Sequence, residues 1–457
     1  MLRVKPPAWV EEAQVHALAW LAAGNLAGLA LAAMLLFPPL GDLSGPLTYG
    51  RWAAVHIDLS IYGWCSLPLL ALLFHLYEPP SGDAGGGGRT ATWAIRWWSG
   101  ALAFQAVSSL TGHSSGKVFA EWSGAARWVF LSAWIFAAVA VTAGFARRLR
   151  ARGRGELAES RLSLAAKALG LAFLTAAPPA LFFAASPGLY PPINPESGGA
   201  TSGNTLASVL GVALLLALTP FLTGLRPRDG GRFSFFVFAA LAGHFVFLAL
   251  LGGGDHSHRE PLQVAALFSS LVWLPLLAEH WRRFPWPARS RRWVWAMAAW
   301  GLVLASTGLL AGAPGVAERI KYTNTLVGHV HAAVAGLTTA WLFVLLDQIA
   351  ERRGPGPAGR SLFADRPAFA AWQLGSVLQV CALSLVGQAE AGSPQILWSG
   401  AAVVSWGYGL RLAGGLFMAS AAWRWLRAAS NSVAAAPAEE VSHEILVADL
   451  LPGSRLG

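Results

Sequence analysis

Twelve long apolar blocks run through the sequence, and they constrain the fold more than any other feature. A bilayer core about 30 Å thick needs roughly 20 apolar residues of helix to cross it. The blocks lie at residues 13–37, 51–77, 92–113, 126–146, 162–186, 202–224, 231–252, 261–281, 293–314, 324–349, 367–390 and 398–428. Only 12% of the 457 residues are charged, against about 25% in a soluble domain. The sequence therefore predicts an all-α integral membrane protein, a bundle of twelve membrane-spanning helices.

The net charge of +10 is distributed as membrane topology requires, and not as in a nucleic-acid interface. Arginines fill the loops after the fourth, sixth, eighth and tenth blocks, whereas the long loop at 187–202 contains no Lys or Arg. Positive residues stay on the cytoplasmic side of a membrane. We therefore expect both termini in the cytoplasm and no nucleic-acid partner. The predicted membrane domain covers residues 1–428, and a polar cytoplasmic tail covers residues 429–457.

Polar groups from four distant blocks reach one depth in this topology. Blocks two and ten both run inward, which places His56, His329 and His331 near the same outer level. Asn204 at the start of block six and residues 255–258 at the end of block seven reach that level too. Polar groups inside a membrane are costly and usually mark function. The remaining histidines of the blocks and their edges are interpreted as interhelical hydrogen-bonding or proton-relay groups: His16, His75, His113, His244 and His280.

The His329-Val330-His331 spacing separates its two imidazoles. On a helix they point roughly 200° apart, at about 100° per residue, so they cannot bind one metal together. They can bind two cofactors on opposite sides of the tenth helix. A planar haem takes one or two axial histidines. The pattern predicts one haem bound from blocks two and ten, and a second haem with one ligand and an open face. The chain has no Cys-x-x-Cys-His motif for a covalently bound haem.

Five short stretches resemble the catalytic subunit I of haem–copper oxidases, closest to the C-family (cbb-type) oxidases and the related nitric oxide reductases. They are residues 48–56 (TYGRWAAVH), 62–64 (YGW), 116–122 (GKVFAEW), 327–332 (VGHVHA) and 411–415 (RLAGG). The resemblance extends over nearly the whole chain, and the family core also has twelve helices. It implies that His56 and His331 bind a low-spin b-type haem and that His329 binds a high-spin b-type haem. It also implies that Glu121 helps to hold a calcium ion near the haem propionates.

The family's second metal, copper or non-haem iron, is held by three histidines, and this set is broken here. The position on block six is Asn204, and the His pair at the end of block seven reads Asp255-His256, with His258 close behind. An alignment shifted by two residues would use His258 and Arg259 instead. An amide oxygen is a weak ligand for these metals, and a carboxylate favours a harder ion such as iron. Asn204, Asp255, His256 and His258 therefore form either a mixed nitrogen–oxygen metal site or no metal site.

The resemblance implies a respiratory-type oxidoreductase subunit in the inner (cytoplasmic) membrane of a prokaryote. It would reduce oxygen with electrons from a c-type cytochrome or quinol. The family's oxidases carry a redox-active Tyr shortly before the His pair, and residues 247–251 contain none. Nitric oxide reductases also lack it but carry carboxylates near the second metal, for which Glu260 is the nearest candidate. Nitric oxide reduction is thus the alternative activity. A non-catalytic gas-sensing or electron-transfer haem protein that has lost the second metal is the alternative of another class.

Overall fold

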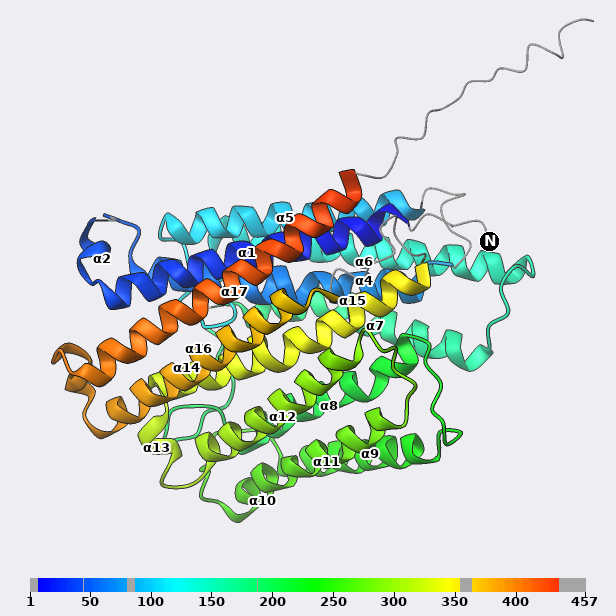
Figure 1. The fold of residues 1–457 in the computed structure, drawn as a ribbon. Coiled ribbons are helices and arrows are strands. Elements are labelled where there is room, and N and C mark those ends of the chain that lie inside the picture. The colour runs from blue at the N-terminus through cyan, green and yellow to red at the C-terminus, as the bar shows by residue number, and fades with distance from the viewer. Residues whose placement is uncertain (1–6, 44, 80–86, 187, 354–363, 435–457) are drawn as a thin grey trace, which may run out of the picture.

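The computed structural model describes residues 7–43, 45–79, 87–186, 188–353 and 364–434. These residues form a bundle of long helices that run roughly along one axis, and they contain no β-strand (Figure 1). Within them, ten helices are long and apolar enough to cross a membrane. The chain is therefore an all-helical, multi-pass membrane protein, as the sequence predicts.

Each of the twelve predicted blocks lies on a long helix. The ten candidate spans are α1 (Ala8–Leu36), α3–η1–α4 (Tyr49–Asp58, Leu59–Cys65, Ser66–Tyr77), α6 (Gly124–Gly153), α7 (Arg161–Ala184), α8 (Ser202–Leu222), α9 (Arg232–Leu251), α10–η2–α11 (Pro261–Ser269, Ser270–Val272, Trp273–Arg282), α12 (Arg291–Gly312), α14–η3–α15 (Asn324–His331, Ala332–Thr338, Thr339–Arg353) and α16 (Arg366–Gly392). The other two blocks lie on α5 (Gly87–Leu110) and α17 (Ala402–Ala434), and the connections carry α2 (Pro39–Leu43), α13 (Ala317–Ile320) and η5 (Pro394–Trp398). Helix α17 thus continues past the predicted boundary at residue 428, and residues 435–457 of the predicted tail lie outside the described residues.

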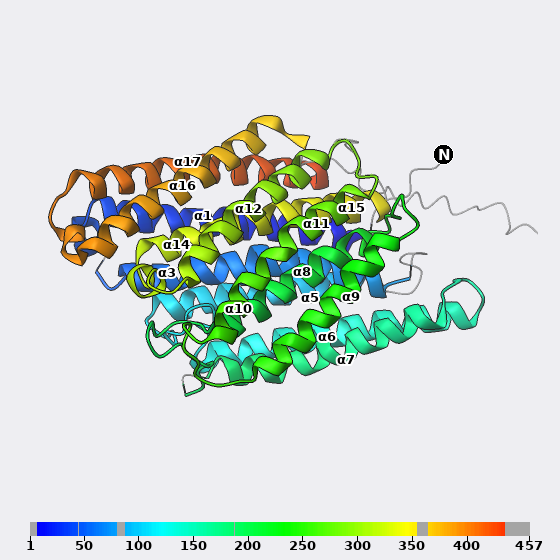
Figure 2. The same ribbon diagram turned by 90° about the horizontal axis from the view of Figure 1, so that it is seen from below.

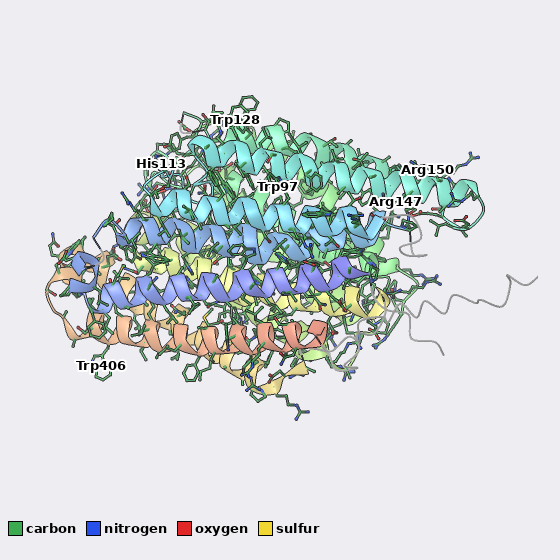
Figure 3. The ribbon with its side chains drawn as sticks, turned by 90° about the horizontal axis from the view of Figure 1, so that it is seen from above. Trp97, His113, Trp128, Arg147, Arg150 and Trp406 are labelled. Carbon is green, nitrogen blue, oxygen red and sulfur yellow. The ribbon has the colours of Figure 1, made fainter. Side chains whose placement is uncertain are left out.

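The two ends of the bundle differ in charge. Arg147 and Arg150 lie at one end, which we call the basic end, and His113 and Trp406 lie at the opposite end (Figure 3). Helix α1 begins and α17 ends at the basic end (Figure 1). Because successive spans alternate in direction, the arginine-containing loops after α6, α8 and α11 fall at the basic end, as does Arg352 near the end of α15.

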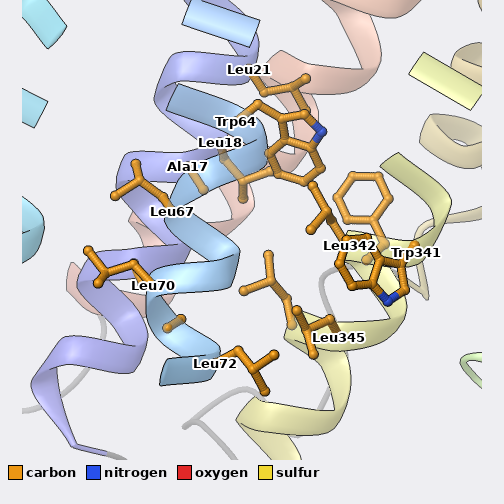
Figure 4. Packing of buried hydrophobic residues seen from close by; sticks show 14 of the residues in the cluster. Ala17, Leu18, Leu21, Trp64, Leu67, Leu70, Leu72, Trp341, Leu342 and Leu345 are labelled. Atoms are coloured by element: carbon orange, nitrogen blue, oxygen red, sulfur yellow. The ribbon is translucent and has the colours of Figure 1, made fainter. Parts of the chain in front are cut away.

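The core is formed by apolar side chains from helices that are distant in sequence. Leu18 of α1, Leu67 of α4 and Leu342 of α15 are fully buried in one cluster (Figure 4). Helix α17 packs between α1 and α16, and α5 packs against α1, α3 and α6. Helices α6 and α7 lie side by side at the edge of the bundle (Figure 2). Outward faces carry large exposed apolar side chains such as Leu162 and Phe235, which a membrane protein presents to lipid.

A π-helical segment follows each of the two helices that carry the predicted haem ligands. Segment η1 begins three residues after His56, and η3 begins directly after His331. Such segments frequently occur at functional sites. The Thr339 hydroxyl donates to the carbonyl of Val334, five residues back, at 2.8 Å, and it accepts a 2.9 Å hydrogen bond from the indole of Trp64. This contact joins the end of η3 to η1 and fixes the two ligand-bearing helices relative to each other.

Replacing Thr339 with Val is expected to destabilise the junction between these helices. The change keeps the shape but removes the hydroxyl, so the buried Trp64 N–H loses its acceptor at a cost of about 1–3 kcal/mol. Thermal unfolding in detergent should show a lower midpoint for Thr339→Val than for Thr339→Ser, which retains the hydroxyl. Equal midpoints for the two variants would contradict a structural role for this hydrogen bond.

Candidate functional site

His56 of α3 and His331 of α14 face each other across the helix interface. Their ring centroids are 6.3 Å apart, and their ring planes differ by 22°. An imidazole bound to a metal at about 2 Å has its ring centre about 3 Å from that metal, so two imidazoles on opposite sides of one metal have centres about 6 Å apart. The observed spacing fits a pair of histidines that bind one metal from opposite sides.

The hydrogen bonds of this pair fix the tautomer of both rings. Nδ1 of His56 lies 2.8 Å from the carbonyl oxygen of Gly24, and Nδ1 of His331 lies 2.8 Å from that of Val327. A carbonyl only accepts, so in the neutral imidazole the proton is on Nδ1 and the lone pair is on Nε2. Neither Nε2 has a hydrogen-bond partner among the described residues. A metal-bound His commonly donates its other ring N–H to a carbonyl, which is the arrangement seen at both residues.

Glycine allows the His56 ring to lie against α1. A Cβ at Gly28 would be 2.9 Å from Cε1 of His56, closer than the about 3.5 Å at which carbon atoms pack. The absence of a side chain at residue 28 therefore positions this imidazole.

Gly28→Ala is expected to displace the His56 ring and to destabilise the fold by about 1–3 kcal/mol, as overpacking does. Gly100→Ala is the matched control, because a Cβ at Gly100 of α5 would meet nothing within 4 Å. The thermal unfolding midpoint should fall for Gly28→Ala and stay near that of wild type for Gly100→Ala. A Gly28→Ala variant as stable as the control would show that the ring has room to move.

His329 lies on the other side of α14 and contacts α12. Its Nδ1 is 2.8 Å from Oγ1 of Thr307, and that hydroxyl donates to the carbonyl of Val303 at 2.8 Å. The hydroxyl proton is thus already committed, so Thr307 accepts from Nδ1–H and leaves the lone pair on Nε2 of His329. A Cβ at Gly308 would lie 3.1 Å from Cε1 of this ring. Neighbours on α12 therefore orient His329 as carbonyls orient the other two rings.

A cavity of about 810 Å³ opens beside His329 and lies among α8, α10, α11, α12 and η3. Its walls are mainly apolar, and they include hydroxyls from Thr205 and Ser208 of α8. Neither His56 nor His331 lines this cavity. Pockets for small molecules and cofactors usually measure about 300–1,000 Å³. The two histidines of the His-x-His motif therefore serve two separate places, one on each side of α14.

An unpaired cation lies near each of these places. Arg411 of α17 is only 5% exposed, and it is close enough to His56 and His331 to interact electrostatically with both. Lys321, between α13 and α14, interacts in the same way with His329, and burial lowers its pKa. Neither side chain forms an ion pair within the described part of the chain. Because burying an unpaired charge is costly, both cations fit sites that take an anionic group.

Asn204 and Asp255 hold a loop and do not face His329. The Asn204 amide donates to the carbonyl of Pro192 at 2.9 Å, and Oδ1 of Asp255 accepts from the backbone N–H of Ile193 at 2.9 Å. Neither residue lines the cavity beside His329. Both side chains fix the segment between α7 and α8.

His256 and His258 are paired with carboxylates of the same outer region. Nδ1 of His256 lies 3.2 Å from Glu260, whereas buried His258 lies 3.1 Å from Glu318 and 3.6 Å from Glu196. Across the described ranges, no group of three or more His, Cys, Asp or Glu side chains is placed to hold a metal ion. The structure thus brings the three haem-ligand candidates into two defined sites, whereas each of the four second-metal candidates has a hydrogen-bond or ion-pair partner in the outer region.

Glu121 is buried, and it orders the loop before α6. One of its carboxylate oxygens accepts from the Ser114 hydroxyl and from the backbone N–H of Gly116, both at 2.9 Å. It interacts electrostatically with Asp58, which is fully buried and accepts a 2.8 Å hydrogen bond from Gln105. Sequence reasoning missed Asp58, although an acidic residue two positions after His56 in an apolar block is a usable signal.

Two other membrane histidines use both of their ring nitrogens to join helices. His244 lies 2.9 Å from the hydroxyl of Ser269 and accepts at 3.1 Å from the indole of Trp273. Nε2 of His280 lies 3.0 Å from the carbonyl of Ala217, and its Nδ1 lies 3.5 Å from the hydroxyl of Ser234. These contacts agree with the interhelical role expected for them and distinguish them from His56, His329 and His331.

No protein-family model and no curated protein sequence matches the chain. The interpretation of the site therefore depends on the geometry around the three histidines and on the motifs that contain them.

Proposed function

We propose that the chain is a two-haem membrane oxidoreductase subunit with the twelve-span architecture of haem–copper oxidase subunit I. The observation that carries the proposal is the His56–His331 pair, with both Nδ1 atoms bonded to carbonyls and both Nε2 atoms free. Helices α5 and α17 would complete the twelve spans, since they pack along α1 within the bundle. Buried Arg411 helps to explain why α17 is less apolar than its neighbours.

Haem, when bound, supplies a one-electron redox centre at the bis-histidine site and an open coordination position at the single-histidine site. His56 and His331 would hold a low-spin b-type haem, and His329 would hold a high-spin one. Arg411 and Lys321 would offset the charge of the haem carboxylates, one cation near each site. Because both sites share α14, electrons would have a short path from His331 to His329.

Oxygen is the proposed substrate at the His329 site, and nitric oxide is the alternative. Both are small and weakly polar molecules, which suits the mainly apolar walls of the cavity beside His329. Electrons would enter the low-spin site from a c-type cytochrome or quinol. The chain would lie in the inner membrane, and the positive-inside rule would orient its basic end toward the cytoplasm. Calcium at Glu121 and copper or non-haem iron near Asn204 remain part of the proposal as further metals.

A non-catalytic haem protein is the second candidate function, as a gas sensor or an electron-transfer module. The observation that favours it is that Asn204, Asp255, His256 and His258 each have a hydrogen-bond or ion-pair partner within the outer region. In this case the bis-histidine site and the His329 site would be kept, while the second metal of the family would be lost.

Measurements on the purified protein distinguish these functions. Haem, iron, copper and calcium are quantified per chain, and oxygen and nitric oxide consumption are measured with a chemical reductant and a c-type cytochrome. Two haems with turnover of either gas support the oxidoreductase. Two haems without turnover support the non-catalytic protein. A chain that binds no haem when haem is supplied would overturn both.

A further inference from the structure

The cavity beside His329 extends far beyond the reach of that side chain. Its wall includes α12 from Arg291 to Leu309, a rise of about 27 Å at 1.5 Å per residue. A hydrocarbon core is about 30 Å thick. The cavity therefore runs from the depth of His329 nearly to the basic end.

Arginines surround the cavity where it reaches the basic end. Arg228, Arg282 and Arg291 line it there, next to the indoles of Trp286 and Trp295. A second, polar pocket of about 320 Å³ shares Arg228 and Arg282 with the cavity. A polar pocket thus continues into an apolar one at the level of the membrane surface, where tryptophans are enriched.

The positive charge at the junction of the two pockets, where Arg228 and Arg282 line both, is only partly balanced. The carboxylates of Asp229 and Glu279 lie 2.9 and 2.8 Å from Arg283, so they are committed to it. Arg282 has only a 3.3 Å contact to Glu279. Arg228 and Arg291 form no side-chain hydrogen bond or ion pair with the residues described. Two free guanidinium groups therefore border the mouth of an apolar cavity.

We propose that this junction binds one anionic phospholipid of the leaflet at the basic end. Its phosphate would be held by Arg228 and Arg291, and one acyl chain would fill the inner half of the cavity. Basic pockets between membrane helices on the cytoplasmic side bind anionic lipid headgroups, and an acyl chain reaches across about half of the core. The proposal goes beyond the proposed function and does not require haem at His329.

Native mass spectrometry of the full chain tests the proposal, with phosphatidylglycerol and phosphatidylcholine supplied in turn. Wild type should retain one phosphatidylglycerol at least tenfold more tightly than phosphatidylcholine. Arg228→Gln/Arg291→Gln should lose this preference, whereas Arg150→Gln/Arg152→Gln, which removes equal charge at the basic end outside both pockets, should keep it. Ala298→Phe, which places a larger side chain in the apolar part of the cavity and leaves the arginines in place, should also weaken lipid binding.

Three results would overturn the proposal. They are equal binding of the two lipids, an unchanged preference in Arg228→Gln/Arg291→Gln, and loss of the preference in the control double variant to the same extent. Inorganic phosphate that displaces the lipid at low millimolar concentration would show a free-anion site and overturn the acyl-chain half of the proposal. The experiment measures the mass of the bound lipid and does not require bound haem. Its result is therefore independent of the haem assignment.

Discussion

Replacing His331 with Ala is expected to remove the proposed low-spin haem and to leave the proposed haem at His329 in place. His331 provides one of the two free Nε2 atoms at the bis-histidine site, and its ring lies 6.3 Å from that of His56. Only Val330 separates it from His329, but the two side chains lie on opposite sides of α14. Haem content should therefore fall from two to one per chain, and the sharp absorbance band of a bis-histidine haem should disappear.

Exogenous imidazole separates a ligand role of His331 from a structural one. The Ala variant leaves a space of the shape of the missing ring, so added imidazole should restore the low-spin spectrum in part. His113→Ala is the control, because His113 lies in an exposed loop, where its ring contacts the hydroxyl of Thr111 of the same loop. A His331→Ala variant that folds, keeps two haems and keeps the low-spin band would rule out His331 as a ligand.

The helices and the separation of the two histidines were predictable because both follow from simple periodicities. Long apolar blocks predict the spans, and a spacing of two residues on a helix predicts opposite directions for His329 and His331. This inference depends only on two positions of one helix, because the two histidines of the His-x-His motif are neighbours in sequence. No long-range information is needed to see that one metal cannot take both rings.

The features that shape the sites depend on contacts between helices that periodicity does not reveal. The π-helical segments η1 and η3 arise where the helices join through Trp64 and Thr339. Gly28 becomes important only when α1 lies against the ring of His56. Thr307 and its partner His329 are 22 residues apart in sequence and meet only where α12 packs against α14. Such pairings follow from the packed structure alone.

The sequence left open whether the four second-metal candidates form a metal site, and the reason is physical. Asn204, Asp255, His256 and His258 share a depth, but depth does not fix direction. In the structure, these side chains form hydrogen bonds or ion pairs with a loop carbonyl, a backbone N–H group and nearby carboxylates. Side chains at a helix end or in a loop have many partners within reach, whereas those inside a span have few.

His329→Ala is expected to give the reverse pattern to His331→Ala. The low-spin band should stay, while the haem with an open face should be lost together with its carbon monoxide difference spectrum. Gas consumption, if present in wild type, should fall by about a hundredfold or more, because loss of even a group that only orients a ligand costs about 10–100-fold.

Thr307→Val supplies the graded comparison for His329. The variant keeps the imidazole and removes the hydroxyl that accepts from its Nδ1 at 2.8 Å, so the ring loses its orientation but not its free Nε2. Carbon monoxide binding should weaken to a level between those of wild type and His329→Ala, and the low-spin band should be unchanged. If His329→Ala removed the low-spin band instead, or if both single variants lost both haems, the two sites would not be independent. The division of α14 into two ligand faces depends on this reciprocal loss, since each histidine serves as the control for the other on the same helix.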